Sequence, residues 1–391
     1  MEKHYVYAVL GAGRQGTAAA YDMARWGDAR RVVLADRDLE IAQGAAERVN
    51  ALLGQTVAEP AQVDVGDGKA IVQLLTGVDA CLSAVPYYYN LDITQAALQA
   101  GAHLCDLGGN TDIAIQQHGS DAQARAAGLS IIPNCGQVPG LGTTLMVHAI
   151  ELLDEARDVY MWDGGIPQKP RPPFDYLLTF HIAGLTNEYA EPAIFIRDGK
   201  VAEIEPMTEL ETVEFPAPIG TLEAFVAGGG TDTMPWTYEG RLRTLQNLTL
   251  RHPGNLRQLR AFYDLGLWDL TPIQAGDVEV VPREVFHALF EPKVTFPDDK
   301  DMVIVRVQAL GQKDGQDAEA LVELIDYFDE ETGFTAMERA TGWSAAIVAQ
   351  MMARGQTPRG AGGVESMVPA RPFVDELGRR GLNVSERVTL K

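Results

Sequence analysis

The chain has 391 residues, more than a single hydrophobic core usually accommodates, so two domains are expected. Its formal net charge of −22 would repel DNA, RNA and an anionic membrane surface, which excludes them as electrostatic partners. Hydrophobic residues make up 46% and charged residues 22% of the chain, close to the average of soluble globular proteins, so both domains should be well packed.

The beginning of the chain predicts a cytoplasmic protein. Residues 1–7 run directly into a strand without a basic leader segment, and no run of 18 apolar residues occurs. Cys81, Cys105 and Cys135 lack CxxC spacing and accompany apolar segments, which predicts buried free thiols. The histidines and cysteines are scattered without ligand spacing, so no metal site is predicted.

The first 135 residues alternate between apolar strand candidates and helix candidates. This alternation predicts an α/β Rossmann domain with a doubly wound parallel sheet of six strands, complete by residue 133. The predicted strands cover residues 5–10, 31–35, 62–65, 78–85, 103–107 and 129–133. The predicted helices cover residues 17–26, 38–53, 90–100, 122–127 and 140–153.

Residues 136–340 differ in character, because Pro- and Gly-rich turns separate their strand candidates. This pattern predicts a second α+β domain with a mixed or antiparallel sheet. The predicted strands cover residues 158–162, 176–182, 193–196, 245–251, 302–310 and 319–328, the last two joined by a turn at 311–315. Helices are predicted at 344–353 and 372–380, the second of them near the end of a polar tail.

Three glycines, Gly11, Gly13 and Gly16, form a GxGxxG motif between the first strand and the first helix. Glycines at this spacing permit a tight turn, close approach of a dinucleotide's diphosphate and close packing of the helix. The diphosphate then meets the positive end of the helix. Arg14 and Gln15 lie inside the motif, and all five residues are predicted to bind the cofactor.

Asp36 ends the second predicted strand, twenty residues after Gly16. A carboxylate there accepts hydrogen bonds from the adenosine ribose and repels a 2′-phosphate, which favours NAD. Arg37 follows and could pair with such a phosphate, so NADP stays the alternative.

Ala84, Val85 and Pro86 end the fourth predicted strand, beside the point where open sheets bind ligands, and are predicted to line the nicotinamide site. Three tyrosines follow. Tyr87 is a candidate substrate-site residue, although adjacent tyrosines equally form packing seams between domains.

Several motifs in order make the chain resemble the saccharopine dehydrogenase family, and most closely its lysine 6-dehydrogenase branch. The resemblance implies a Rossmann domain at 1–135, a substrate-binding and dimerisation domain at 136–340, and a C-terminal segment, 341–391, that returns to the first domain. Its markers are the glycine loop, SAVPYYYN at 83–90, DLGG at 106–109, GQVPG at 136–140, GGIP at 164–167, IGTLEAF at 219–225, GGGTDT at 228–233, TLRHPGN at 249–255 and TGWSAAIVAQMMARG at 341–355.

The resemblance also implies the site residues. Arg251 matches the arginine that grips the substrate's α-carboxylate. Thr231 stands where saccharopine-forming enzymes carry a second arginine, Val138 where they carry an aspartate and Asp163 where they carry a cysteine. These departures imply a substrate with fewer carboxylates than saccharopine, such as lysine.

Amine oxidation requires loss of the ammonium proton before hydride transfer to the cofactor, so a base is needed. Asp106 and Asp163 are the predicted catalytic residues, with Asp232 and His181 as further candidates. The favoured function is NAD-dependent oxidation of the distal amine of a lysine-like amino acid by a homodimer or larger homo-oligomer. The alternatives are a saccharopine or carboxylated-polyamine dehydrogenase and a non-catalytic NAD-binding protein.

Overall fold

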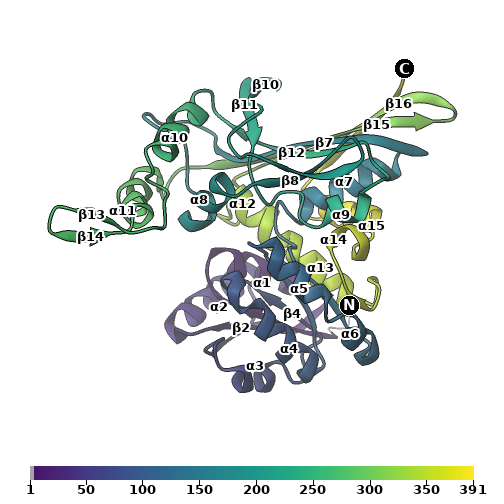
Figure 1. Cartoon of the computed structure of the whole chain (residues 1–391). Coiled ribbons are helices and arrows are strands. Elements are labelled where there is room, and N and C mark those ends of the chain that lie inside the picture. The colour runs from purple at the N-terminus through teal and green to yellow at the C-terminus, as the bar shows by residue number, and fades with distance from the viewer. Residues whose placement is uncertain (1–3) are drawn as a thin grey trace.

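The computed structural model describes residues 4–391, which form two lobes (Figure 1). One lobe contains the N-terminal residues together with helix α13 (Ser344–Ala353) from near the other end of the chain. The second lobe contains the middle of the chain and the C-terminal strand β18 (Val384–Leu390). The chain therefore passes between the lobes more than once.

Seven strands form the first sheet, in the order β17-β6-β5-β4-β1-β2-β3, and every pairing is parallel. Successive strands run outward in opposite directions from the β1–β4 pair, which makes this pair the switch point at which open α/β sheets bind ligands. The predicted Rossmann fold is confirmed. The strands are β1 Tyr5–Leu10, β2 Ala29–Asp36, β3 Ala58–Gln62, β4 Ala80–Ser83, β5 His103–Asp106, β6 Ser130–Ile132 and β17 Gly360–Ala361.

Helices cover both faces of this sheet because its strands are apolar on both sides. Side chains of α1, α2 and α13 pack on one face, and those of α3, α4 and α6 pack on the other. The helices of this lobe are α1 Arg14–Trp26, α2 Leu39–Leu53, α3 Gly68–Leu75, α4 Asn90–Ala100, α5 Thr111–His118 and α6 Asp121–Ala127, with a 3₁₀ turn, η1, at Tyr87–Tyr89.

The second sheet has nine strands and is mixed, since β12 runs parallel to β7 while its other pairings are antiparallel. The main path runs β10-β11-β12-β7-β15-β16-β18, and β8 pairs with β12 and β9. This confirms the predicted mixed sheet. Its strands are β7 Glu155–Pro167, β8 Ala193–Arg197, β9 Lys200–Ile204, β10 Glu211–Glu214, β11 Thr221–Val226, β12 Thr244–Arg251, β15 Asp301–Lys313, β16 Gln316–Tyr327 and β18.

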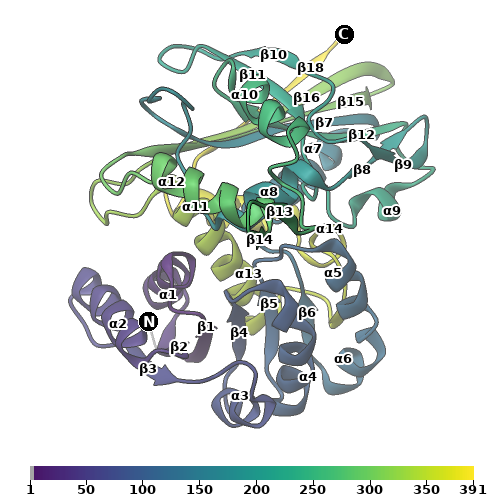
Figure 2. The ribbon, with the colours of Figure 1, turned by 60° about the vertical axis from the view of Figure 1, so that its left-hand side comes forward.

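The two lobes share one hydrophobic core. The cluster that contains α1 and α13 continues through α7 (Leu141–Glu151) to the inner face of the second sheet. A short hairpin, β13 (Ile273–Ala275) and β14 (Val278–Val280), projects from the second lobe and comes forward in Figure 2. The remaining helices are α8 Ile182–Ala190, α9 Met234–Tyr238, α10 Asn255–Asp264, α11 Pro282–Val294, α12 Ala336–Glu338, the π-helical turn η2 Arg339–Trp343, α14 Val364–Met367 and α15 Ala370–Arg379.

Several predicted elements were wrong. The third strand is β3, rather than residues 62–65, because an exposed edge strand needs no apolar alternation. The apolar residues 176–181 form no strand; they lie against a buried aromatic cluster, and helix α8 begins at Ile182. Helices α3 and α5 were not expected.

The C-terminal segment also differs from expectation. The first sheet is not complete by residue 133, since β17 pairs with β6 as a seventh strand. After α15, the tail continues as β18 and pairs with β16 in the second sheet. Residues 341–391 therefore contribute to both lobes, with α13 and β17 in the first and β18 in the second.

Candidate dinucleotide and substrate site

The glycine loop leaves one open position beside the first helix. Gly11 has a φ of +98°, and a Cβ there would lie 2.7 Å from the Ala84 carbonyl oxygen. A Cβ at Gly16 would overlap the Gly11 carbonyl oxygen. A Cβ at Gly13 would be in open space. Apart from its chain neighbours and its own helix, no atom of residues 4–391 would lie within 4 Å of it. Two glycines thus permit the tight turn, and the third leaves space for a ligand.

Helix α1 begins at Arg14 with Gly13 as its N-cap. The backbone N–H groups of Arg14, Gln15 and Gly16 belong to the first turn, where no intrahelical acceptor exists. The Arg14 side chain is directed to the other end of the chain, since its Nε donates to Glu338 Oε1 at 2.7 Å. The loop therefore presents backbone amides, the groups that receive a diphosphate at a helix N-terminus.

Asp36 lies beside this loop at the end of β2. Its Oδ2 accepts from the Ala12 backbone N–H at 2.9 Å and its Oδ1 from that of Asp38 at 3.1 Å. These bonds orient the carboxylate and leave lone pairs for ribose hydroxyl groups. Arg37 is exposed next to it. The residues present fit a dinucleotide, with amides for the diphosphate and a carboxylate for the sugar.

The end of β4 borders the loop at the switch point. Ala84 and Val85 are half-buried against Gly11, and Pro86 is exposed. The Tyr87 ring lies against Gly109, which follows β5. Tyr89, in contrast, packs on the apolar cluster of the outer sheet face. Tyr87 thus lies at the carboxyl edge of the sheet, between the ends of β4 and β5.

Asp106 is buried at the end of β5 and joins three segments. Its Oδ1 accepts from the backbone N–H groups of Gly108 and Asn134, and its Oδ2 accepts from Gln117 Nε2. Burial raises its pKa, and these hydrogen bonds oppose the shift. The Asp106 carboxyl group therefore holds the loops after β5 and β6 in place at the edge of the sheet. Its predicted catalytic role stays a prediction.

The second sheet turns a polar face toward the first lobe. Along β12, Leu248 and Leu250 point into an apolar cluster, so Asn247, Thr249 and Arg251 share the opposite face. Asp163 of β7 stands beside Thr249 in the register. All four polar residues of this face are buried. Such a concentration of buried polar groups requires partners or a ligand.

Arg251 is only 4% exposed, and its guanidinium lies over two aromatic rings. Its Cζ is 5.5 Å from the Tyr176 ring centroid and 5.6 Å from that of Tyr189. One NH1 hydrogen bond goes to the Leu250 carbonyl oxygen, while Nε has no partner within residues 4–391. The guanidinium is therefore held by stacking and keeps a donor for an anionic ligand.

Two carboxyl groups accompany this arginine. Asp163 accepts from Gln137 Nε2 at 3.2 Å and from Asn247, and burial raises its pKa against these bonds and the charge of Arg251. Glu188 of α8 is near enough to Arg251 and Asp163 for their charges to act on it, and burial raises its pKa to about 8. Gln137 precedes α7, at the junction of the lobes. The predicted residues Asp163 and Arg251 are thus brought together, beside a Glu188 that was not predicted.

Thr231 and Val138 lie at the same junction. The Thr231 hydroxyl donates to the Ile194 carbonyl oxygen at 2.6 Å, so it is committed to the fold. A Cβ on Gly230 would meet Val138 Cγ1 at 3.1 Å and would overlap the Asn247 amide. Gly230 therefore lets Val138 and Asn247 approach each other, and neither Thr231 nor Val138 adds a charge beside Arg251.

His181 does not lie in an apolar strand as expected. It is exposed and caps α8, its Nδ1 accepting from the Ala183 N–H at 3.2 Å. Residues 4–391 contain no group of three or more His, Cys, Asp and Glu side chains that could hold a metal ion. The three cysteines are free and buried, as predicted. Within the same residues, no helix is long and apolar enough to cross a membrane.

A separate acidic pair joins the lobes. Asp232 Oδ1 accepts from Asn134 Nδ2 at 2.6 Å, while its buried Oδ2 has no donor in the described part of the chain. Burial and the neighbouring Glu365 raise the pKa of Asp232 to about 8. A carboxyl with a raised pKa stabilises the fold in its protonated form, and this stability is lost as the pH rises through 8.

Asp232→Asn should therefore flatten the pH dependence of stability. The free energy of unfolding of the native protein is expected to fall between pH 6 and pH 9 as Asp232 ionises beside Glu365. The amide of the variant carries no proton to lose and still accepts from Asn134. Urea unfolding at both pH values measures the two slopes; equal slopes would contradict the role given to Asp232.

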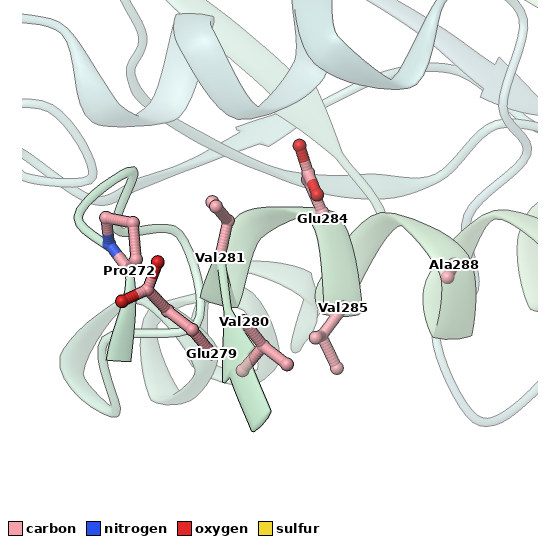
Figure 3. Close-up of a pocket in the computed structure, with 7 residues that line it drawn as sticks. All are labelled: Pro272, Glu279, Val280, Val281, Glu284, Val285 and Ala288. Atoms are coloured by element: carbon pink, nitrogen blue, oxygen red, sulfur yellow. The ribbon is translucent and has the colours of Figure 1, made fainter. Parts of the chain in front are cut away.

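A shallow pocket of about 360 Å³ lies on the projecting hairpin, away from the polar face (Figure 3). In Figure 3 the Glu284 and Glu279 side chains extend from α11 and β14, with apolar side chains between them. It contains none of the residues around Arg251, so it is not the candidate site. Its lining residues are Pro272, Glu279, Val280, Val281, Glu284, Val285 and Ala288.

Two family models match the chain, one after the other. Residues 7–132 match the saccharopine dehydrogenase NADP binding domain, and residues 136–382 match the saccharopine dehydrogenase C-terminal domain. The chain belongs to the saccharopine dehydrogenase family. The family recognised from the sequence motifs is therefore confirmed, and the boundary between the two matches falls at the passage from the first lobe to the second.

Two proteins with related sequences match large parts of the chain. The chain is 24% identical over 245 residues to saccharopine dehydrogenase [NADP(+), L-glutamate-forming] of Pyricularia oryzae, covering 60% of this chain and 52% of that protein. It is 21% identical to the mitochondrial alpha-aminoadipic semialdehyde synthase of Rattus norvegicus, covering 84% of this chain and 43% of the relative. The chain thus spans about half the length of these relatives.

The fold of this family member also resembles a solved one. Apo saccharopine dehydrogenase (L-Glu forming) from Saccharomyces cerevisiae superposes with a TM-score of 0.78 at 17% identity, covering 99% of this chain and all of that one. At this identity the likeness concerns the fold, so the two-lobed architecture is shared. The chemistry has to be argued from the side chains around Arg251 and the glycine loop.

Proposed function

We propose that this protein oxidises the distal amine of a lysine-like amino acid, with NAD as the hydride acceptor. The observation that carries the proposal is the single stacked arginine of the polar face, Arg251, whose free donor suits one carboxylate. Thr231 and Val138 add no second cation beside it. A substrate with one carboxylate fits this site better than the three-carboxylate saccharopine.

The proposed division of labour follows the two lobes. The amides that begin α1 and the Asp36 carboxylate would hold the dinucleotide, which supplies a hydride acceptor when bound. Arg251 would bind and orient the substrate's carboxylate. Asp163, which is near enough to Arg251 to feel its charge and has a pKa raised by burial, would hold the proton released by the substrate ammonium. Enclosure of the polar face excludes water from these groups.

The direct test is NADH formation at 340 nm with purified protein and L-lysine, L-ornithine, diamines or saccharopine, with NAD or NADP. Turnover of lysine with NAD would support the proposal. Activity confined to saccharopine would overturn the argument from the single arginine and favour the named activity of the relatives. Nicotinamide-cofactor binding without turnover of any amine would instead support a non-catalytic NAD-binding protein.

The choice of NAD rests on Asp36, although the matching family model and the first relatives carry NADP in their names. Asp36→Asn keeps an acceptor for the Ala12 N–H but removes the charge that repels a 2′-phosphate. The ratio of kcat/KM for NAD to that for NADP is expected to fall at least about tenfold in initial-rate measurements. In the matched variant Arg37→Ala this ratio should not fall; an unchanged ratio in Asp36→Asn would refute the assignment.

We also propose a cytoplasmic homodimer that forms through the second sheet. Strand β18 lies at the edge of this sheet with its residues from Ser385 onward exposed, and an unpaired edge is a surface for strand pairing. Sedimentation equilibrium at micromolar concentration tests the proposal, and a monomer would contradict it.

A further inference from the structure

Glu188 is the charged residue of the polar site that no motif marked. It lies in the last turn of α8, where the Gly228 N–H donates to its backbone carbonyl oxygen at 2.7 Å and holds this turn against the GGGTDT loop. The side chain is partly buried. Burial and the charges of Arg251 and Asp163 determine the pKa of Glu188. No hydrogen bond from residues 4–391 contributes to this pKa. The carboxylate therefore keeps its acceptor capacity.

Two buried side chains of β12 have polar atoms without partners, Arg251 near Glu188 and Asn247 four residues earlier on the strand. Arg251 Nε has no acceptor within residues 4–391, and the buried Asn247 Oδ1 has no donor there. Both side chains are more than nine-tenths buried, at 4% and 3% exposure. Buried polar atoms without partners are costly, so a ligand that both accepts and donates hydrogen bonds would relieve them. The acceptor that Arg251 lacks is supplied by a carboxylate, and in an α-amino acid this carboxylate stands next to an ammonium that a carboxylate such as Glu188 can accept.

The charges of the site also favour an amino acid as the ligand. Arg251 contributes one positive charge, and Glu188 and Asp163 contribute two negative charges when ionised, with Tyr176 and Tyr189 as the other titratable groups beside Arg251. With both carboxyl groups ionised, the site carries one surplus negative charge, a state that burial disfavours by raising the pKa of both groups. Buried charge is tolerated when it is compensated. A ligand with two ammonium groups and one carboxylate compensates it, whereas a ligand with surplus carboxylates does not.

We propose that Glu188 is a specificity-determining residue that receives the α-ammonium of the substrate while Arg251 receives the adjacent carboxylate. The inference deepens the proposed function, on which the choice of a lysine-like substrate rests. Glu188 and Arg251 lie on different elements, α8 and β12, which meet where the Arg251 Cζ lies 5.6 Å from the ring centroid of Tyr189, the residue after Glu188. The pair would select α-amino acids over ω-amino acids and plain diamines, leaving Asp163 for the distal nitrogen.

Calorimetric titration of the NADH-saturated protein tests this, because the reduced cofactor permits binding without oxidation. The probes are L-lysine, L-norleucine, which lacks the distal ammonium, and 6-aminohexanoate, which lacks the α-ammonium. The unmodified protein should bind lysine at least about tenfold more tightly than 6-aminohexanoate. In Glu188→Gln this difference should disappear, and norleucine should weaken by the same factor as lysine.

The matched control is Glu191→Gln, which makes the same change at an exposed position just after α8. It should bind all three probes as the unmodified protein does, and both variants should keep the same affinity for NADH. Glu188→Asp keeps the carboxylate on a shorter side chain, so it should restore part of the difference in affinity between lysine and 6-aminohexanoate. Equal loss of both probes in Glu188→Gln, or no binding of lysine by the unmodified protein, would overturn the inference.

The outcome separates the inference from the proposed function. If lysine binds in a Glu188-dependent way but forms no NADH when NAD is supplied, the proposed oxidation fails and the recognition of the α-amino acid head stands. If lysine is oxidised at an unchanged kcat/KM by Glu188→Gln, the function stands and the inference fails.

Discussion

Replacement of Arg251 by methionine is expected to lower kcat/KM for the amino-acid substrate by about 1000-fold, since loss of one partner of a buried charge pair costs several kcal/mol. The change removes the single cation of the polar face and leaves Glu188 and Asp163 without compensation. NADH formation at 340 nm measures the loss. The dissociation constant for NADH should stay unchanged, because the glycine loop lies in the other lobe.

Two further variants make the Arg251 result specific. Arg251→Lys keeps the charge but loses the planar fork that lies over the rings of Tyr176 and Tyr189, so only part of the activity should return. Arg260→Met removes an exposed arginine of α10 that pairs with Asp264, and it should leave kcat/KM unchanged. A folded Arg251→Met protein with undiminished kcat/KM would show that substrate binds elsewhere.

Alanine at Gly13 and at Gly16 should have opposite effects. Gly13→Ala should change the free energy of unfolding by less than about 1 kcal/mol, because its Cβ enters open space at an N-cap. It should raise the dissociation constant for NADH at least about tenfold, because that space is where the diphosphate approaches the backbone. Gly16→Ala should lower the free energy of unfolding by about 3 kcal/mol, because its Cβ overlaps the Gly11 carbonyl oxygen.

Urea unfolding without cofactor and fluorescence titration with NADH measure the two effects separately. Gly44→Ala in α2 is the matched control. As at Gly13, a Cβ at Gly44 would have no atom of residues 4–391 within 4 Å, apart from its chain neighbours and its own helix. It should leave NADH binding unchanged and raise stability by about 0.5 to 1 kcal/mol. Wild-type affinity for NADH in Gly13→Ala would place the cofactor away from this loop.

The dinucleotide half of the site was predictable because its determinants are local. Gly11, Gly13 and Gly16 act through a turn of a few residues, and Asp36 lies at the end of the neighbouring strand. Hydrophobic periodicity was enough to place both strands and the helix between them. The substrate half depends on β7, β12 and α8, which meet only through the fold, so only the family resemblance pointed to Arg251 and Asp163.

Glu188 was missed because residues 176–182 were interpreted as a strand. Their apolar side chains are buried in a loop that covers the aromatic cluster, and loops rarely bury so much apolar surface. A signal was nevertheless present: Ile182, Leu185, Thr186 and Tyr189 are spaced at i, i+3, i+4 and i+7, and all four are buried on one face of α8. Recognition of that helix would have placed Glu188 next to the buried face.

The position of α13 bears on how the protein is made. This helix contacts β4 and β5, and its residues from Ser344 to Met352 are buried against the first sheet and its neighbours. On the ribosome, β4 and β5 emerge some 240 residues or more before α13, so the apolar surface that α13 covers stays bare until every strand of the second sheet except β18 has been synthesised. The nucleotide lobe therefore gains the helix that covers β4 and β5, and its seventh strand β17, only when the last fifth of the chain has been translated.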